Sequence, residues 1–377
     1  MLAFPARRHI PERNPMRTIG MSNYTVGEDC FEAIPAVLAK YRAHKVVLAG
    51  GQRALAAAVP GITAVLDAAG IEVLDTIVYG TDSTEGAISH LVEAPAFREA
   101  DVAFAIGGGK AIDTVKTAAK ELGKTVFSVP TICSNCSAAT AIAVVYHEDG
   151  SLKGYAYPDA PAHIFINPRI VAEAPAEYFW AGVGDALSKQ PEVEYASSAG
   201  NLEHTAELGL ALAHTCSEPL FTYGVEGLAD VRARHSSEAV CRIVLDIIVN
   251  TGYVSNLTNQ DDFYFNSSLA HAFYNATTGI PREGKRLHGE VVSFGVLVLF
   301  AYTGNDVELA RYAAFNKEMG LPVTLTELDL NESHLERIAE LAQNTNEWKQ
   351  ANPVPFSSDK FIEAIKAADA YGRTLTA

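Results

Sequence analysis

The chain has 377 residues, of which 48% are hydrophobic and 20% charged, and its formal net charge at pH 7 is −16. This length exceeds one typical domain and fits two, and the composition excludes an intrinsically disordered chain. The acidic balance makes nucleic acids and anionic membranes poor candidates as partners. Five cysteines at irregular spacing predict no disulfide framework and a reducing, cytoplasmic location.

Neither the N-terminus nor any apolar run predicts contact with a membrane. Residues 1–21 carry four arginines and lack an apolar core, so they do not predict a secretory signal. The longest apolar stretch, residues 291–302, is too short to span a bilayer and predicts a buried helix.

The first half of the chain alternates strand-like and helix-like patterns. Apolar, β-branched runs that end at glycine or proline predict buried strands, and alanine-rich or periodic runs between them predict helices. This order predicts a parallel sheet with helices on both faces. The expected strands are residues 45–50, 71–80, 101–109, 125–130 and 163–168, the expected helices are residues 52–69 and 111–122, and residues 141–157 are expected to form a hairpin.

Strand patterns nearly vanish after Pro175, which suits the first turn of a helix. We therefore predict an α/β nucleotide-binding domain over residues 1–172 and an all-α domain over residues 173–377. The expected helices of the second domain are residues 176–198, 203–216, 222–229, 236–251, 267–277, 289–303, 306–319, 333–343 and 359–371.

A glycine-rich turn at residues 107–114 (GGGKAIDT) lies between an expected strand and an expected helix. Glycines let a phosphate approach the backbone, the helix N-terminus offers free N–H groups, and Lys110 adds a positive charge. The alternative is a tight turn whose glycines serve packing alone. The turn has neither the Walker A nor the GxGxxG spacing, which disfavours a P-loop NTPase and a standard Rossmann dehydrogenase.

The ribose end of a dinucleotide site gives an indication of the cofactor. NAD sites often carry an acidic residue after an early strand, where it accepts from the ribose 2′-OH. Here Gly51, Gln52 and Arg53 follow the first expected strand. An arginine at this place can pair with a 2′-phosphate, which favours NADP(H) over NAD(H). The alternative is that Arg53 is a solvated residue in the first helical turn.

Three residues form a candidate metal site. Asp185 lies in an apolar, glycine-flanked helical segment, His271 in a small apolar segment, and His288 just before an apolar helix. A buried carboxylate is costly unless it is paired or binds a cation. Two imidazoles and one carboxylate form an open site typical of catalytic zinc or iron. The alternative is that both histidines are ordinary core residues.

Several segments, taken in order, resemble the iron-containing (group III) alcohol dehydrogenase superfamily, in particular its glycerol dehydrogenase-like branch. They are GGGKAIDT at 107–114, VPT at 129–131, GVGDAL at 182–187, LAHAFYN at 269–275 and HGEVVSFG at 288–295. The resemblance covers the chain after about residue 17. It implies the two-domain fold shared with dehydroquinate synthase, with the active site between the domains.

The resemblance also implies roles for individual residues. Asp185, His271 and His288 match the metal ligands of the family, where the metal is usually zinc in this branch and iron elsewhere. The positions that surround the dinucleotide are matched by Gly108, Gly109, Lys110, Asp113, Thr131, Ser134, Thr140, Ile142 and Tyr146.

Two departures from the family pattern concern the substrate. Cys136 stands where glycerol dehydrogenases carry an aspartate that touches the polyol, and Tyr274 replaces a second histidine of the family motif. The lost carboxylate weakens the case for glycerol and removes a charge that would repel an acid. We therefore rank a 2-oxo acid/2-hydroxy acid pair above glycerol/dihydroxyacetone. Cys133 and Cys136 form a CxxC, whose alternative interpretations are a redox pair or half of a zinc site.

The expected function is a metal-dependent NAD(P)(H) oxidoreductase that interconverts a small alcohol and its carbonyl compound by direct hydride transfer. Cys136 is expected to contact the substrate, and His271 or Tyr274, one helical turn apart, to join the proton relay. We expect a homo-oligomer, from dimer to octamer. The alternatives are a dehydroquinate synthase-like lyase that forms a carbocycle and a non-catalytic binding protein on the same fold.

Overall fold

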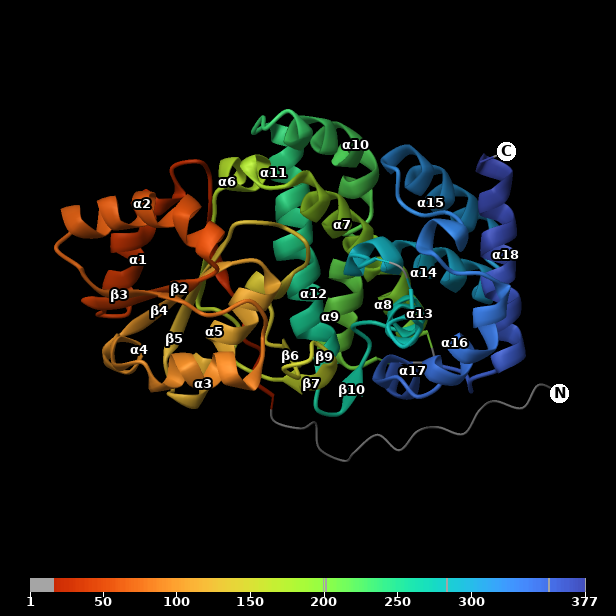
Figure 1. Cartoon of the computed structure of the whole chain (residues 1–377), viewed down its shortest axis with the longest axis horizontal. Coiled ribbons are helices and arrows are strands. Elements are labelled where there is room, and N and C mark those ends of the chain that lie inside the picture. The colour runs from red at the N-terminus through yellow and green to blue at the C-terminus, as the bar shows by residue number, and fades with distance from the viewer. Residues whose placement is uncertain (1–16, 199, 201, 283, 352, 377) are drawn as a thin grey trace.

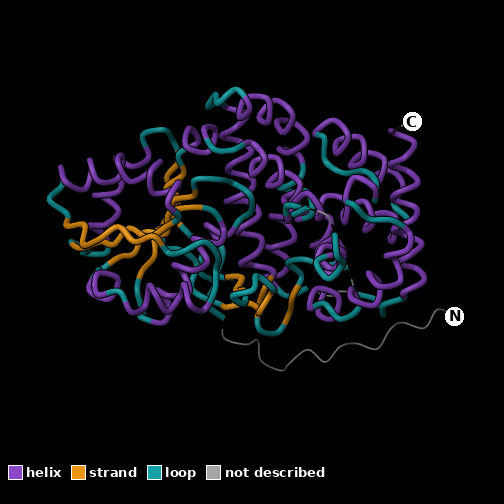
Figure 2. Tube along the Cα trace, in the orientation of Figure 1, coloured by secondary structure: helices purple, strands orange, loops and turns teal. Residues whose placement is uncertain are grey.

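The computed structural model describes residues 17–376 except 199, 201, 283 and 352. Most of the arginine-rich stretch considered above as a secretory signal lies at residues 1–16, outside the described part. Strands concentrate in the N-terminal half, while the C-terminal half is built almost entirely of helices (Figures 1 and 2). The predicted fold class is therefore confirmed.

Six parallel strands form the main sheet, in the order β1-β8-β5-β4-β2-β3. The four inner strands have apolar, β-branched sequences that suit burial on both faces, whereas the two edge strands are partly exposed. The strands are β1 Asn23–Val26, β2 Lys45–Gly50, β3 Glu72–Val78, β4 Val102–Gly107, β5 Thr125–Pro130 and β8 His163–Ile166.

Alternate residues of the strands serve two different layers of helices. Val46 and Leu48 belong to the core shared with α1 (Ile34–Lys40) and α2 (Gln52–Ala68). Their neighbour Val47 faces the opposite core. That core includes residues of α3 (Glu85–Glu93), α4 (Pro95–Glu99) and α5 (Gly109–Glu121), which lie across the sheet from α1 and α2 (Figure 1). The carboxyl ends of the parallel strands therefore meet at one edge, where α2 and α5 begin.

The predicted hairpin is confirmed as an antiparallel pair, with β6 at Ala143–Tyr146 and β7 at Leu152–Ala156. A second small pair joins β9 (Asn259–Gln260) to β10 (Phe263–Tyr264). The 3₁₀ turns are Cys30–Ala33, Ser137–Ala139, Thr326–Leu328 and Glu332–His334.

The helical half is arranged around α14, His288–Thr303, almost all of which is buried. It packs against α7, α13, α15 and α18, so it is apolar on every side rather than on one stripe. The other helices are α6 Pro168–Glu173, α7 Ala176–Ala186, α8 Lys189–Ser197, α9 His204–Ala213, α10 Glu218–Arg232, α11 Glu238–Leu245, α12 Thr251–Thr258, α13 Leu269–Thr277, α15 Asp306–Met319, α16 Leu335–Ala342, α17 Asn346–Ala351 and α18 Ser358–Thr376.

Two predicted helices have a different course. The predicted helix over residues 176–198 is divided into α7, Ala176–Ala186, and α8, Lys189–Ser197. The sequence pattern predicts a helix over residues 236–251, whereas α11 continues through a π-helical turn, Asp246–Asn250, into α12 and ends at Thr258. The run Glu238–Thr258 is long and apolar enough to cross a membrane, and 72% of its most apolar window is buried within the protein, as in a core helix.

The last strand of the sheet ends at Ile166, and helices follow from Pro168 onward. The division of the chain between residues 172 and 173 stays a prediction.

Candidate metal centre

Three possible metal ligands from three helices converge at one point. Asp185 lies in α7, His271 in α13 and His288 at the start of α14. Asp185 Oδ1 lies 3.0 Å from His288 Nε2 and 3.6 Å from His271 Nε2. The ligand atoms of the three side chains all lie within 4.8 Å of one another. The structure thus brings together the residues that the sequence analysis selected.

The geometry of this cluster fits a cation. Asp185 Oδ1 is buried and makes no hydrogen bond within the described residues, although His288 Nε2 is near. Tetrahedral zinc with ligand bonds of about 2.0–2.2 Å separates its ligand atoms by roughly 3.3–3.5 Å. The two distances from Oδ1 are close to that separation. A divalent ion between this buried carboxylate oxygen and the two imidazole nitrogens would satisfy all three groups.

Glycines on α7 and α14 bring Asp185 next to His288. A Cβ on Gly289 would lie 1.8 Å from the Ala181 carbonyl oxygen and 2.7 Å from the Asp185 nitrogen. A Cβ on Gly184 would lie 2.5 Å from the Gly289 carbonyl oxygen. The two helices therefore touch backbone to backbone, and only glycine permits this approach.

Replacement of Gly289 by alanine tests this crossing. A methyl group at 1.8 Å from backbone cannot be absorbed by a side-chain shift. We expect Gly289→Ala to lower the free energy of unfolding by roughly 3 kcal/mol or more, in a urea titration followed by circular dichroism. Gly20→Ala is the matched control, because nothing lies within 4 Å of its added methyl group. Equal stability of the two variants would contradict the crossing.

Glu192 in α8 holds one of the candidate ligands in place. Its Oε2 lies 2.6 Å from His271 Nδ1, and its Oε1 accepts the backbone N–H groups of Ser268 at 2.7 Å and His271 at 3.0 Å. The Glu192 side chain is fully buried. A carboxylate at Nδ1 fixes the imidazole with Nε2 directed at Asp185, the arrangement of carboxylate–histidine–metal triads.

The electrostatics of the cluster favour added positive charge. Burial acts to raise the pKa of the Asp185 carboxyl, but the imidazoles of His288 and His271 outweigh it and hold that pKa well below its usual range. Burial acts to lower the pKa of His271, but the carboxylates of Glu192 and Asp185 raise it to about 10. Without a metal ion, a proton on His271 therefore balances part of the carboxylate charge.

Two further side chains were proposed from the sequence for the substrate side, Tyr274 and Cys136. The Tyr274 ring meets the His288 ring edge to face, with centroids 4.2 Å apart. Burial and then the Asp185 charge raise the pKa of the Tyr274 phenol, which stays protonated at neutral pH. Burial also raises the pKa of the Cys136 thiol, and Lys189 offsets part of that rise. Cys133 is fully buried, and burial raises its pKa strongly, which disfavours a redox pair with Cys136.

The glycine-rich turn begins α5, and two of its glycines lie close to side chains of a neighbouring segment. A Cβ on Gly108 would lie 2.5 Å from Ile132 Cδ1, and one on Gly109 would lie 2.7 Å from Asn135 Nδ2. Both contacts come from the connection that follows β5. Both contacts are with side chains rather than backbone, and the role of these glycines at a phosphate stays a prediction.

Two of the residues matched to the cofactor site have their charges balanced within the protein. The Lys110 ammonium pairs with Asp82 and lies 5.1 Å from the centroid of the Tyr146 ring. Asp113 is buried; its Oδ1 lies 3.0 Å from Lys116 Nζ and accepts the Ser137 hydroxyl, and its Oδ2 accepts the N–H of Val144 at 3.0 Å. Asp113 therefore anchors the connection between β5 and β6.

Lys116, which the sequence analysis missed, completes this anchor. Its ammonium is fully buried and donates to the carbonyl oxygens of Ser137 at 2.9 Å, Thr140 at 3.1 Å and Ile142 at 2.7 Å. Lys116 follows Asp113 by three residues, a helical spacing that could have indicated the pair. Lys116 and Asp113 of α5 therefore fix the connection between β5 and β6, which carries several of the predicted cofactor contacts.

The remaining predicted cofactor residues lie at or near the edge formed by the carboxyl ends of the strands. Arg53 is exposed in the first turn of α2, and among the described residues it forms no ion pair. Thr131 directly follows β5, and its N–H donates to the Gly107 carbonyl oxygen at 3.1 Å. Thr131 and Thr140 are buried, and Ser134 is half-buried.

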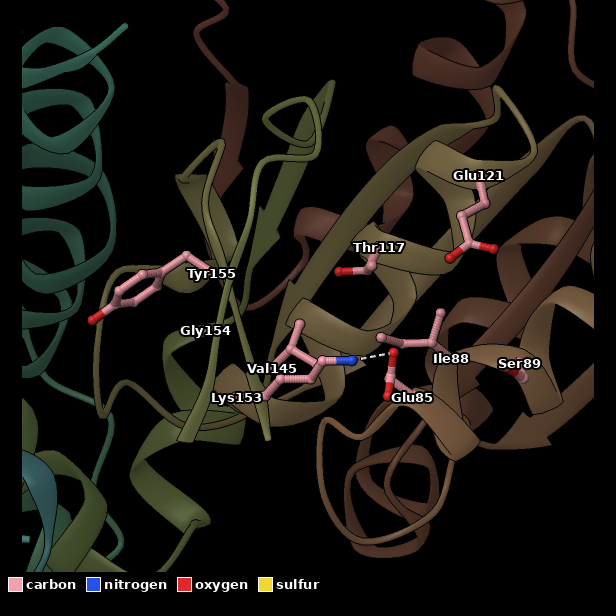
Figure 3. A pocket seen from close by; sticks show the side chains of 9 residues that line it. All are labelled: Glu85, Ile88, Ser89, Thr117, Glu121, Val145, Lys153, Gly154 and Tyr155. Atoms are coloured by element: carbon pink, nitrogen blue, oxygen red, sulfur yellow. Dashed lines mark ion pairs between the residues drawn. The ribbon is translucent and has the colours of Figure 1, made fainter. Parts of the chain in front are cut away.

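A separate hollow of about 330 Å³ lies between α3, α5 and the β6–β7 hairpin (Figure 3). Glu85 and Lys153 form an ion pair across it, while Tyr155 points away from the other labelled side chains. None of the candidate metal ligands lines this hollow. Its charged residues, Glu85, Glu121 and Lys153, are all exposed, so it does not compete with the three-ligand cluster as the reaction site.

Comparison with known proteins decides the family. Residues 25–175 match the family model of iron-containing alcohol dehydrogenases. Glycerol dehydrogenase of Thermotoga maritima is 35% identical over 297 residues, which cover 76% of this chain and 78% of that protein. The chain belongs to the iron-containing alcohol dehydrogenase family.

Two further family members are similar over nearly the whole chain. Hydroxycarboxylate dehydrogenase A of Escherichia coli K12 is 29% identical over 364 residues, 95% of this chain and 99% of that protein. The crystal structure of a probable glycerol dehydrogenase from Sinorhizobium meliloti 1021 matches with a TM-score of 0.80 and 26% identity, covering 96% of this chain and all of that one. The chain under study is therefore an alcohol oxidoreductase that acts on CH–OH donors.

Proposed function

We propose that the chain interconverts a 2-oxo acid and its 2-hydroxy acid, using NADP(H) and one divalent ion bound by Asp185, His271 and His288. In the reducing direction, a 2-oxo acid, NADPH and a proton give the 2-hydroxy acid and NADP⁺. The observation that carries the proposal is the buried oxygen of Asp185, which makes no hydrogen bond within the described residues and lies 3.0 Å and 3.6 Å from two imidazole nitrogens. The family resemblance matches these three residues to the metal ligands, so we place the reaction at this cluster.

Each part of the cluster has a defined task in this proposal. When bound, the metal supplies Lewis-acid polarisation of the substrate oxygen, and the nicotinamide supplies or accepts the hydride. Glu192 keeps His271 Nε2 directed at the ion. The protonated Tyr274 phenol, in contact with His288, is placed to donate a hydrogen bond to the substrate. The neutral thiol of Cys136 lines the substrate side without repelling an acid.

Zinc is our first choice for the ion and iron the second. Two imidazoles with one carboxylate occur in catalytic zinc sites and also in iron sites. The branch resemblance favours zinc, while the name of the family favours iron. Metal analysis of the purified protein decides between them.

Glycerol is the second candidate substrate, because glycerol dehydrogenase of Thermotoga maritima is 35% identical to this chain. The similarity to hydroxycarboxylate dehydrogenase A extends over more of the chain and supports the acid. Family membership favours an oxidoreductase over the carbocycle-forming lyase and the non-catalytic binding protein considered from the sequence.

A turnover panel tests the proposal. Oxidation of NADPH and NADH is followed at 340 nm with 2-oxo acids, aldehydes and dihydroxyacetone, before and after treatment with a chelator. We expect 2-oxo acids to give the highest kcat/KM, and the chelator to abolish turnover until zinc or iron is restored. Turnover of no carbonyl compound would contradict the oxidoreductase assignment, and chelator-resistant turnover would contradict the metal.

The preference for NADP(H) rests on Arg53, whose exposed guanidinium has no ion pair among the described residues. A hydrogen-bonded ion pair with the 2′-phosphate contributes about 1.5–3 kcal/mol. We expect Arg53→Gln to raise the KM for NADPH roughly 10- to 100-fold and to leave the KM for NADH within about 3-fold. Arg337→Gln in α16, also exposed, is the control. Equal effects of Arg53→Gln on the two cofactors would sink this role.

A further inference from the structure

Lys189 is a buried cation without a counter-ion. Only 7% of the residue is exposed, and its ammonium donates to the carbonyl oxygen of Asn266 at 3.0 Å and to the Asn266 side-chain oxygen at 2.7 Å. No carboxylate of the described residues lies within ion-pairing distance of it. The other deeply buried lysine, Lys116, does have one, Asp113 at 3.0 Å. Of the two lysines, only Lys116 has a carboxylate within ion-pairing distance among the described residues.

A buried ammonium group without a carboxylate partner favours the binding of an anion. Burial of an ammonium group is costly unless opposite charge lies nearby, and neutral oxygens offset only part of the cost. Asn266 uses two of the three N–H donors of Lys189, which leaves one donor for another partner. A carboxylate brought by a ligand would complete both the hydrogen bonding and the charge balance.

Lys189 lies beside the candidate metal centre. It is the first residue of α8 and follows Asp185 by four residues. The backbone keeps right-handed helical angles at Leu187 and Ser188, between α7 and α8. Residues four apart in a helix share a face, with Cβ atoms about 5–6 Å apart.

We propose that Lys189 determines specificity for acids: its ammonium binds the carboxylate of a 2-oxo acid whose keto oxygen lies at the Asp185–His271–His288 cluster. This inference rests on the proposed function and names the residue that selects the substrate class. The carboxylate adjoins the keto group in a 2-oxo acid, so a cation beside the metal centre is where a substrate of this class requires it.

The test compares pyruvate with methyl pyruvate, which keeps the keto group and lacks the negative charge. Lys189→Met removes the ammonium and keeps the length of the side chain, whereas Lys189→Arg keeps the charge. We expect Lys189→Met to lower kcat/KM for pyruvate roughly 10- to 100-fold, mainly through KM, and for methyl pyruvate less than about 3-fold. Lys189→Arg should regain part of the loss. Lys366→Met, an exposed lysine of α18, is the control.

A binding measurement separates recognition from turnover. Oxamate, an unreactive anionic analogue of pyruvate, should raise the thermal midpoint of the wild type and of Lys366→Met, and not that of Lys189→Met. Equal losses of kcat/KM for both substrates would assign Lys189 a structural role through Asn266 and overturn the inference. Equal kcat/KM of the wild type for methyl pyruvate and pyruvate would also overturn the inference, but it would leave the proposed reduction of 2-oxo acids intact. Reduction of neither compound would overturn both.

Discussion

Asp185→Asn is expected to abolish metal binding and to lower kcat/KM for carbonyl reduction by roughly 1,000-fold or more, since a Lewis-acid metal contributes several kcal/mol to the transition state. Asparagine has almost the volume of aspartate, so the crossing of α7 and α14 is kept. It lacks the negative charge that the two imidazoles of His271 and His288 surround. Metal content by plasma mass spectrometry and steady-state kinetics measure the two effects.

The control for this variant is Asp159→Asn, which changes an exposed aspartate paired only with the exposed Lys120. Its metal content and kcat/KM should match the wild type. A folded Asp185→Asn protein that retains one ion per chain and full turnover would show that Asp185 is not a ligand.

Replacement of Glu192 is expected to have the second large effect, on the affinity for zinc. In Glu192→Gln, the oxygen can still accept the N–H groups of Ser268 and His271, but an amide N–H₂ then faces His271 Nδ1. The imidazole would have to place its proton on Nε2, the atom directed at the metal. We expect the dissociation constant for zinc to rise roughly 10- to 100-fold, as for other residues that orient a metal ligand. Competition with a chromophoric chelator measures it without reference to turnover.

Glu192→Ala separates orientation of the ligand from stability of the fold. It leaves two buried N–H groups and the imidazole without their acceptor, so the free energy of unfolding should fall by roughly 3 kcal/mol or more. Glu194→Gln, on an exposed position of the same helix, is the control for both variants. Zinc affinity of Glu192→Gln equal to that of the Glu194 control would refute the orienting role.

Much of the sheet could be predicted because its strands are apolar, β-branched runs that end at glycine or proline. β1 could not be predicted, since it is only four residues long, its first two residues are exposed, and it pairs with the distant β8. The course of α11 into α12 also escaped prediction. A π-helical turn at Asp246–Asn250 adds a residue to the helical repeat, which sequence periodicity does not reveal.

The candidate ligands could be selected from the sequence, but the sequence did not show that their side chains converge at one point. Asp185, His271 and His288 lie on three helices, and only the glycine contacts of Gly184 and Gly289 bring two of these helices together. The family motifs supplied that information indirectly.

The residues that support the site were missed because their roles depend on burial. Glu192 and Lys189 are charged residues on a short helix, a setting that is usually solvated. Their spacing from Asp185, seven residues for Glu192 and four for Lys189, was the available signal, because it places all three on one helical face. The predicted cofactor contacts, the homo-oligomer and the cytoplasmic location stay predictions.

The most direct test of the account is titration of the chelator-treated protein with zinc, with carbonyl reduction measured at each point. We predict that turnover returns in proportion to bound zinc and reaches its maximum at one ion per chain, and that Asp185→Asn neither binds the ion nor regains turnover. Full turnover of the protein before any zinc is added, or recovery in Asp185→Asn equal to that of the wild type, would contradict a reaction centred on Asp185, His271 and His288.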